Sequence, residues 1–282
     1  MSRLVRELRL RADGGSLWKY AMQVVAGLVR DVIQSVLNMK PSPKNLVLLA
    51  DVLAHPLLVV GIMKPHEKLR YVTLRDGLTL HYTRNQGDIH TISEIFFKQI
   101  YAIPVGIPAD VYVDLGANIG MASLHFFQKH KPSKVICVEP SPRNLALLRQ
   151  NVSVNALPAT VLEGVISESP GAVKFEIAVE SNAGHIGESG VPVRAFSMEE
   201  VLAETPNRKI DVLKIDVEGY EDTLLRVNNS WLDEVGCIMI EFHDRFPGMT
   251  VDKDGLIAIL KEKGFSHLPS KHPSLPDTFI RR

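Results

Sequence analysis

Short apolar segments alternate with helical segments from residue 110 onward, and this alternation constrains the fold more than any other feature. The apolar segments are continuous, which is typical of strands buried on both faces of a parallel sheet. The helical segments between them would cover those two faces. The sequence therefore predicts an α/β fold with a doubly wound, mostly parallel sheet. The expected strands are 111–115, 135–138, 160–166, 211–215 and 237–241, with 173–178 and 191–196 as two extra strands, and the expected helices are 121–130, 143–151, 198–204, 221–231 and 252–264.

Length and composition are those of an ordinary globular protein. The chain has 282 residues, of which 45% are apolar and 23% charged. It is too apolar to be disordered and long enough for one large domain or a domain with an appendage. Its 32 Lys and Arg side chains equal its 32 Asp and Glu side chains in number, which argues against a bulk nucleic-acid-binding protein. Two cysteines cannot build a disulfide framework, so we expect a cytoplasmic location.

The first 109 residues differ from the rest, and we divide them into two parts. We expect an N-terminal helical extension at 1–68, a β-hairpin and helix lead-in at 69–109, and the main domain at 110–282. The extension contains a helix over 18–38 and an apolar segment, 46–63, that we expect to be a buried helix broken at Pro56. The lead-in contains two short strands, 69–74 and 78–83, around an Asp-Gly turn, and then a helix over 92–101.

The N-terminal extension has two interpretations. Its helices pack on the main domain, or they make peripheral contact with a membrane surface or a partner. A transmembrane helix is not expected, because Asp51 lies within the apolar segment and an Asp at mid-bilayer costs about 2.5–3.5 kcal/mol. A signal peptide is not expected either, because no uninterrupted apolar core follows the N-terminal arginines.

Functional side chains should follow the strands, because ligands of an open parallel sheet bind outside the carboxyl ends of its strands. Asp114 lies at the end of the first strand, and Gly116 and Gly120 follow it. These glycines allow a sharp turn and the close approach of a ligand, and the next helix presents free amide groups. Glu139 ends the following strand, where an acid commonly accepts hydrogen bonds from both hydroxyls of a ribose.

These features favour S-adenosylmethionine over a dinucleotide. Because position 118 is Asn, the motif is not Gly-x-Gly-x-x-Gly. The carboxylate of Asp114 disfavours a pyrophosphate and favours a cationic ligand, and S-adenosylmethionine carries a sulfonium and an ammonium but no phosphate. We predict a site for this cofactor lined by Asp114, Gly116, Ala117, Asn118, Gly120, Glu139, Pro140 and Ser141.

Four segments resemble the FkbM-type methyltransferases, which are class I enzymes that depend on S-adenosylmethionine. They are Val113–Gly120 (VDLGANIG), Val138–Pro142 (VEPSP), Leu213–Glu221 (LKIDVEGYE) and Ile240–His243 (IEFH), and the resemblance extends over roughly 69–268. It implies a Rossmann-like, seven-stranded sheet with strand order 3-2-1-4-5-7-6. It also implies methyl transfer to an oxygen, usually a hydroxyl of a sugar, glycolipid, polyketide or similar metabolite. Tyr220 departs from the family pattern, which usually has Ala there.

Asp216, Glu218 and His243 are the candidate catalytic residues, because they follow two neighbouring central strands. A hydroxyl must lose its proton during methyl transfer, which calls for a base or a metal. Either His243 is the base and Asp216 orients it, or the two bind a divalent cation, and the sequence does not identify the metal. Glu218 could instead accept hydrogen bonds from backbone amides of its turn. Lys214 points inward from its strand, so we expect it to pair with an acid.

Other functions are less consistent with these motifs. A nicotinamide-dependent oxidoreductase would need Gly-x-Gly-x-x-Gly, and an RNA methyltransferase would need a base-flipping motif and basic charge. A non-catalytic module that binds S-adenosylmethionine and docks a complex through its N-terminal helices stays as the alternative. We expect a small-molecule or glycan acceptor and no nucleic-acid partner, and the oligomeric state is not predicted. The implied strand order separates Cys137 from Cys237 by more than the about 7 Å that a disulfide spans, so we expect two buried free thiols.

Overall fold

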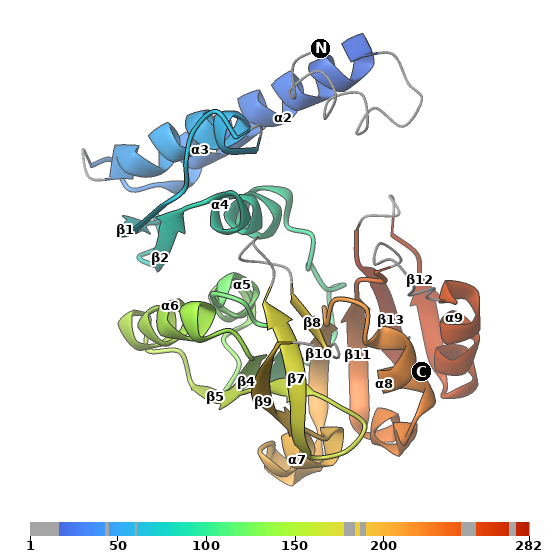
Figure 1. The fold of residues 1–282 in the computed structure, drawn as a ribbon. Helices are drawn as coiled ribbons and strands as arrows, with labels where there is room; N and C mark the ends of the chain where they lie inside the picture. Colours follow the sequence, from blue (N-terminus) through green and yellow to red (C-terminus); the bar gives the residue numbers. More distant parts are fainter. Residues whose placement is uncertain are drawn as a thin grey trace. The chain divides into compact units, whose positions relative to one another are not determined.

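The computed structural model describes residues 17–42, 45–59, 61–177, 184–186, 190–243, 252–270 and 275–281. The chain divides into two compact units, Met1–Lys98 and Gln99–Arg282 (Figure 1). The hairpin of the expected lead-in lies in the first unit, and residues 99–109 lie in the second.

Helices and one hairpin make up the described part of the first unit. The predicted break at Pro56 is wrong, because the helix continues through this residue. Proline has no backbone N–H, so the helix loses one hydrogen bond there, and this loss does not end it. The helix after the hairpin begins earlier than predicted, because the Asn85 side chain accepts a hydrogen bond from the Asp88 N–H and caps it. The elements are α2 (Leu17–Asn38), α3 (Leu46–Val59), β1 (His66–Thr73), β2 (Thr79–Arg84), α4 (Gln86–Ile92) and the π-helical turn η2 (Ser93–Lys98).

Asp51 is a buried carboxylate within the apolar helix α3. The Tyr82 hydroxyl donates a hydrogen bond to its Oδ2 at 2.9 Å, and Arg70 lies 3.1 Å from the same oxygen. The charge is therefore compensated inside the first unit. Among the residues that the structure describes, no helix is both long enough and apolar enough to span a bilayer.

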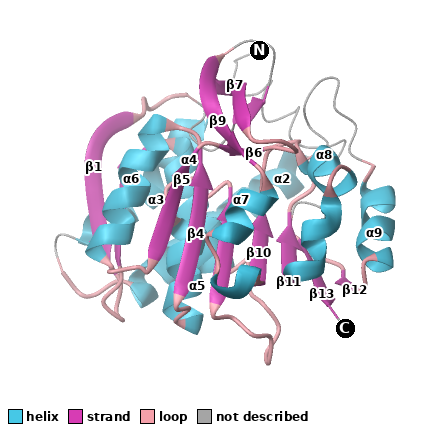
Figure 2. Ribbon diagram, turned by 90° about the horizontal axis from the view of Figure 1, so that it is seen from below, coloured by secondary structure: helices cyan, strands magenta, loops and turns pink. Residues whose placement is uncertain are grey.

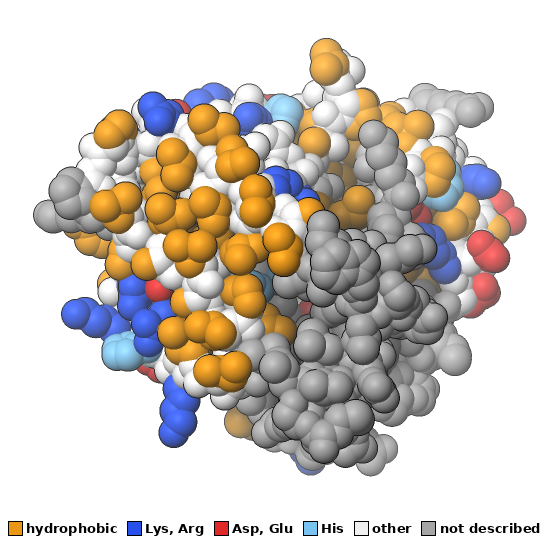
Figure 3. All heavy atoms as spheres, turned by 90° about the horizontal axis from the view of Figure 1, so that it is seen from above, with side chains coloured by type: hydrophobic (Ala, Val, Ile, Leu, Met, Phe, Trp, Pro, Cys, Tyr) orange, Lys and Arg blue, Asp and Glu red, His pale blue; other side chains and the backbone are white. Residues whose placement is uncertain are grey.

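Large apolar side chains are exposed on α2 and α3, as the broad apolar area in Figure 3 illustrates. On each of these helices, several Val, Ile and Leu side chains are at least 40% exposed. Single exposed apolar residues are normal on a protein surface, but a contiguous group usually marks an interaction site. The group consists of Val25, Val29, Ile33, Val36 and Leu37 on α2, and Leu46, Leu53 and Leu57 on α3.

The second unit is built on a seven-stranded sheet with the order β12-β13-β11-β10-β3-β4-β5. Neighbours from β11 to β5 pair in parallel, and β13 is antiparallel to β11 and β12. If these seven strands are numbered 1 to 7 in chain order and read from the β5 edge, their order is 3-2-1-4-5-7-6. The predicted Rossmann-like fold is therefore confirmed. The strands are β3 (Val111–Leu115), β4 (Lys134–Glu139), β5 (Ala159–Glu163), β10 (Ile210–Ile215), β11 (Val235–Ile240), β12 (Phe265–Leu268) and β13 (Asp277–Arg281).

Helices cover both faces of this sheet (Figure 2). The predicted helix 221–231 is shorter than expected, because Asn228 adopts a left-handed conformation with φ 49° and the chain continues as a 3-10 helix. Asn competes with helical hydrogen bonding through its own side chain. The elements are α5 (Met121–His130), α6 (Pro142–Val154), α7 (Met198–Ala203), α8 (Glu221–Arg226), α9 (Lys253–Glu262) and the 3-10 turns η3 (Pro206–Arg208) and η4 (Asn229–Glu234).

A smaller sheet with the order β6-β9-β7-β8 accompanies the main one. The predicted strand 160–166 is divided between the two sheets, with the break at Gly164, whose N–H donates to the Glu139 carbonyl. Residue 178 of the predicted strand 173–178 is outside the described residues. The strands are β6 (Val165–Ile166), β7 (Gly171–Ile177), β8 (Gly184–Ile186) and β9 (Val191–Phe196).

Cys137 and Cys237 are buried free thiols. Cys137 is on β4 and Cys237 is on β11, and β3 and β10 lie between these strands. The expectation that they are too far apart for a disulfide is confirmed.

Candidate functional site

The predicted site residues lie at the carboxyl ends of four adjacent strands, β4, β3, β10 and β11. Asp216 directly follows β10, and its N–H donates to the Leu115 carbonyl of β3. Glu241 directly follows β11, and its N–H donates to the Ile215 carbonyl of β10. Parallel register therefore brings residues that are far apart in the sequence to one edge of the sheet.

The loop after β3 turns sharply, as the sequence predicts. Gly116, Asn118 and Gly120 have φ values of 78°, 51° and 85°. A Cβ on Gly116 would lie 1.9 Å from the Asp216 carbonyl oxygen, and a Cβ on Gly120 would lie 2.6 Å from a Leu148 methyl carbon. Glycine at these two positions is therefore required by the packing of the protein itself, and the approach of a ligand to the loop stays a prediction.

Glu139 connects this loop to the start of α6. Its Oε2 accepts a hydrogen bond from the Asn118 N–H at 2.9 Å, and its Oε1 accepts one from the Ser141 N–H at 2.8 Å. Burial raises the pKa of Glu139 to about 7, although these hydrogen bonds lower it. Oε1 also accepts a hydrogen bond from Asn144 Nδ2 at 3.3 Å. Each carboxylate oxygen has two lone pairs, so Oε2 is the oxygen of Glu139 that retains capacity to accept a hydrogen bond from a ligand hydroxyl. Ala117 is buried next to Asn118, and Pro140 precedes Ser141, the N-cap of α6.

Asp114 is fully buried and paired with Lys214, as expected for Lys214. The ammonium lies 3.1 Å from Asp114 and 3.2 Å from Asp216, and it donates to the Gly116 carbonyl at 2.9 Å. The Ser123 hydroxyl donates to Asp114 at 2.7 Å. Burial alone would lower the pKa of Lys214, but Asp114 and Asp216 raise it above its ordinary value. A positive charge of the protein itself therefore lies beside Asp114, and the contact of Asp114 with a cationic cofactor stays a prediction.

The three candidate catalytic residues come together, and Glu241 joins them. The Nε2 atom of His243 lies 3.7 Å from Asp216, 3.7 Å from Glu218 and 3.9 Å from Glu241. All four side chains are partly exposed. The site therefore presents one imidazole and three carboxyl groups to a ligand that lies outside the strand ends.

Glu221 orients His243. One of its carboxylate oxygens lies 2.7 Å from His243 Nδ1, and Glu221 is fully buried at the first position of α8. The expectation that Asp216 orients the imidazole is therefore wrong, since Asp216 faces Nε2 instead. Because Nδ1 is engaged, Nε2 is the ring atom available for chemistry.

The carboxylates of this cluster perturb one another. Burial alone would lower the pKa of His243, but Glu221 and Asp216 raise it to about 10. Burial and the charge of Asp216 raise the pKa of Glu218 to about 8 and that of Glu241 to about 7. The cluster therefore holds protons at neutral pH, and groups with such shifted pKa values are typical of functional sites.

The turn that carries Glu218 is strained. Glu218 has φ 50° and Gly219 has φ 96°, and the left-handed region is costly for a glutamate. Tyr220, which departs from the family pattern, directs its hydroxyl to Ser167 and the Glu168 N–H at 3.3 and 3.2 Å. This turn places the Glu218 carboxylate at the cluster, 3.7 Å from His243 Nε2.

The sequence does not predict three residues of the site, Tyr101, Glu221 and Glu241. The Tyr101 hydroxyl hydrogen bonds to Glu241 and lies 3.3 Å from Asp216. Glu241 was assigned only as the last residue of a strand, and Glu221 only as the first residue of a helix. For Glu241 the available signal was its position directly after β11, because acids at strand ends are functional candidates. Glu221, at the first position of α8, carried no such signal.

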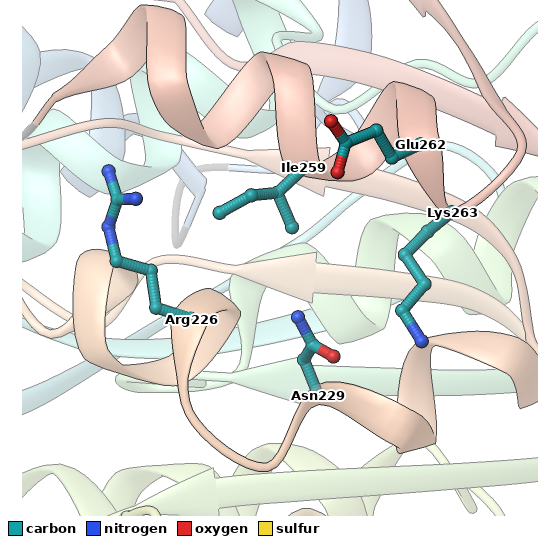
Figure 4. A pocket seen from close by; sticks show the side chains of 5 residues that line it. All are labelled: Arg226, Asn229, Ile259, Glu262 and Lys263. Carbon is teal, nitrogen blue, oxygen red and sulfur yellow. The ribbon is translucent and has the colours of Figure 1, made fainter.

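A surface pocket of about 570 Å³ lies elsewhere on the second unit (Figure 4). It is at the far end of α8, which begins at Glu221 beside the cluster and ends at Arg226 in the pocket wall. Arg226 is already paired with Asp222 and Asp252. The pocket is therefore separate from the candidate site. Its lining residues are Arg226, Asn229, Ile259, Glu262 and Lys263.

The family model described as "Methyltransferase FkbM domain" matches residues 114–266. The 31-O-demethyl-FK506 methyltransferase FkbM of Streptomyces tacrolimicus is 24% identical over 253 residues, covering 74% of this chain and 94% of that protein. The hexuronic acid methyltransferase AglP of Haloferax volcanii is 30% identical over 139 residues, covering 48% and 56%. The AMB antimetabolite synthetase AmbE of Pseudomonas aeruginosa is 26% identical over 239 residues, and the match covers 67% of this chain but 11% of AmbE.

Among solved structures, a methyltransferase FkbM from Methylobacillus flagellatus matches with a TM-score of 0.43 and 15% identity, over 92% of this chain and 60% of that one. The family model spans more than half of the chain, and its matched residues include the loop after β3, Glu139 and the cluster around His243. The chain therefore belongs to the FkbM family and is a methyltransferase.

Proposed function

We propose that the protein transfers a methyl group from S-adenosylmethionine to a hydroxyl oxygen of a sugar, glycolipid, polyketide or similar metabolite. The observation that carries this proposal is the cluster of Asp216, Glu218 and His243, which lies beside the predicted cofactor loop and offers acceptors for the hydroxyl proton. The names of two relatives support the acceptor class, since one methylates 31-O-demethyl-FK506 and another a hexuronic acid.

The residues after β3 and β4 fit S-adenosylmethionine. Glu139 would accept a hydrogen bond from a ribose hydroxyl through Oε2, and the positive-φ turn at Gly116 carries the chain past the strand end beside it. The cofactor supplies an electrophilic methyl group when it is bound. The loop stays in place because the N–H groups of Gly116 and Ala117 both donate to the Val138 carbonyl. The remaining predicted contacts are those of Asp114, Asn118, Gly120, Pro140 and Ser141.

The chain's own residues would contribute alignment and proton acceptance. Holding the acceptor oxygen in line with the methyl group supplies most of the rate in a displacement of this kind. Asp216, Glu218 and His243 would orient the hydroxyl. Asp216 would accept its proton at neutral pH, because, although burial raises its pKa, the charges of Lys214 and His243 lower it overall, and Glu218 and His243 would accept it only after losing their own protons. The strained Glu218 turn supports this role, because strain of this kind is retained where surrounding structure over-determines it and clusters at functional sites.

Replacing Glu139 by Ala should weaken S-adenosylmethionine binding by about 1.5–3 kcal/mol, the range for a hydrogen bond to a charged group. Calorimetric titration measures this loss. Glu163→Ala is the matched control, because Glu163 lies opposite Glu139 on β5, is exposed, and pairs with Arg149. Unchanged affinity in the Glu139 variant would reject its assignment to the cofactor site.

A labelled-methyl assay tests the proposed function directly. Purified protein is incubated with cell extract and methyl-labelled S-adenosylmethionine, and the labelled product is identified by mass spectrometry. We expect label on a hydroxyl oxygen with the wild-type protein and none with Asp216→Ala. Cofactor binding without label in any product would favour the non-catalytic module that docks a complex through its N-terminal helices.

We also propose that the first unit makes peripheral contact with an anionic membrane surface. Residues 1–98 contain 14 Lys and Arg against 8 Asp and Glu, whereas residues 99–282 contain 18 against 24. The neutral total therefore conceals a basic first unit. Exposed apolar side chains on α2 and α3, together with this charge, fit the way amphipathic helices bind the interface of anionic bilayers.

Vesicle flotation should show binding to bilayers that contain phosphatidylserine and less binding to phosphatidylcholine alone. Replacing both Val29 and Ile33 by Asp should abolish it, because these side chains are half exposed on α2. Val154→Asp is the control, since Val154 is equally exposed on α6 in the second unit. Equal recovery of wild-type protein with and without anionic vesicles would contradict the proposal.

A further inference from the structure

We infer that Asp216, Glu241 and His243 form a binding site for one divalent cation of the magnesium or manganese class. One ligand atom from each residue lies within 4.8 Å of the others. The three side chains come from the ends of the neighbouring strands β10 and β11. The binding site itself does not depend on the proposed function. Only the role of the cation in removing the proton of the acceptor hydroxyl rests on that function.

The two carboxylates each have one oxygen held by the protein and one facing a shared space. The Tyr101 hydroxyl hydrogen bonds to Oε1 of Glu241 and lies 3.3 Å from Oδ2 of Asp216, which is also 3.2 Å from the Lys214 ammonium. The opposite oxygens, Oε2 of Glu241 and Oδ1 of Asp216, are 3.9 and 3.7 Å from His243 Nε2. The surrounding residues thus fix the carboxylates so that three donor atoms converge.

Glu221 supplies the support that a metal-bound histidine requires. Histidine ligands of metals almost always donate their other ring N–H to a carboxylate, carbonyl or water, which fixes the tautomer. Glu221 lies 2.7 Å from Nδ1 of His243 and is fully buried, and its other oxygen has no hydrogen-bond partner among the described residues. A cation that displaces the proton from Nε2 would leave Nδ1 donating to Glu221 and would meet the Nε2 lone pair facing Asp216 and Glu241.

The charge of the cluster also calls for a cation. Its described acidic groups outnumber its basic groups by five to two, and ionised carboxylates a few ångströms apart repel one another strongly at low dielectric. Lys214 is already shared between two of the carboxylates. A divalent ion at Nε2 would compensate the excess. The acids are Asp114, Asp216, Glu218, Glu221 and Glu241, and the basic groups are Lys214 and His243.

Two carboxylates and one imidazole suit an octahedral ion. Carboxylate ligands favour Mg²⁺ and Mn²⁺, and imidazole is a ligand for many transition metals. Neighbouring ligands about 2.1 Å from such an ion lie about 3 Å apart, so His243 Nε2 and the carboxylate oxygens would need to approach by about 1 Å. Three protein ligands leave open positions, and an acceptor hydroxyl bound there would lose its proton more readily.

A manganese titration tests the site without S-adenosylmethionine or an acceptor. The full chain is treated with EDTA, dialysed, and titrated with Mn²⁺ while electron paramagnetic resonance measures the free ion. We expect one Mn²⁺ per chain, displaced by Mg²⁺. Glu241→Gln and His243→Ala should each weaken binding at least tenfold, and Glu221→Gln by about 10–100-fold, the range for a residue that orients a ligand. Glu204→Gln, an exposed acid at the end of α7, should bind as the wild type does.

Absence of stoichiometric Mn²⁺ binding by the wild-type protein would overturn the inference, and so would wild-type affinity in the Glu241 and His243 variants. Circular dichroism melting checks that each variant folds, and the wild-type titration decides even if Glu221→Gln does not fold. The manganese titration and the methyl-transfer assay can fail independently of each other. Mn²⁺ binding without methyl transfer would keep the site and reject the function, whereas EDTA-resistant methyl transfer without Mn²⁺ binding would do the reverse.

Discussion

Replacing His243 by Ala should lower the rate of methyl transfer by about 10²–10⁴-fold, the range for loss of general acid–base help. The affinity for S-adenosylmethionine should change little, because the predicted cofactor residues follow β3 and β4 while His243 follows β11. The expected loss is large because Nε2 of His243 is the point on which Asp216, Glu218 and Glu241 converge. Initial rates with saturating cofactor, together with calorimetry of cofactor binding, measure the two effects separately.

His66→Ala is the matched control for this experiment, because His66 is exposed at the start of β1 in the first unit. EDTA distinguishes the two ways in which His243 can act. Loss of wild-type activity in EDTA indicates that His243 holds a cation, and retention of activity indicates that it takes the proton itself. Full activity in the His243→Ala enzyme would contradict both and would leave alignment of the reactants as the source of the rate.

The sheet could be predicted from the sequence because its signals are local. Segments 111–115 and 135–138 are apolar except for Asp114, and an acid stands at the end of each strand: Asp114 in the first and Glu139 after the second. The strand order came from the family resemblance, and the pairing of β3 with β4 and β10 confirms it. Local signals also placed Asp216 and His243 at one edge of the sheet.

The partners of the site residues could not be predicted, because they depend on contacts between distant segments. Glu221 reaches His243 from the first turn of α8, and Tyr101 reaches Glu241 from a segment that precedes β3. No spacing rule specifies such contacts. The same limitation applies to Asp114. The cation that pairs with it, Lys214, is a hundred residues later in the chain and becomes its neighbour through the register of β3 and β10.

Replacing Lys214 by Met should lower the free energy of unfolding by about 3–5 kcal/mol, because removing one partner of a buried ion pair leaves the other charge uncompensated. Lys214 is 3% exposed and is the cation next to both Asp114 and Asp216. Urea unfolding measures the loss. The loss should be smaller at a pH low enough to protonate the two carboxylates, since neutral acids need no partner.

Two further variants separate the ion pair from other effects of the substitution. Lys209→Met removes an exposed lysine just before β10 and should change the free energy of unfolding by less than about 0.5 kcal/mol, as is usual at the surface. Adding Asp114→Asn to Lys214→Met should restore part of the lost stability, because the double variant no longer buries the Asp114 charge without its cation. A Lys214→Met protein as stable as the wild type would show that the two carboxylates are protonated or hydrated in the fold, and that Lys214 does not hold the ends of β3 and β10 together.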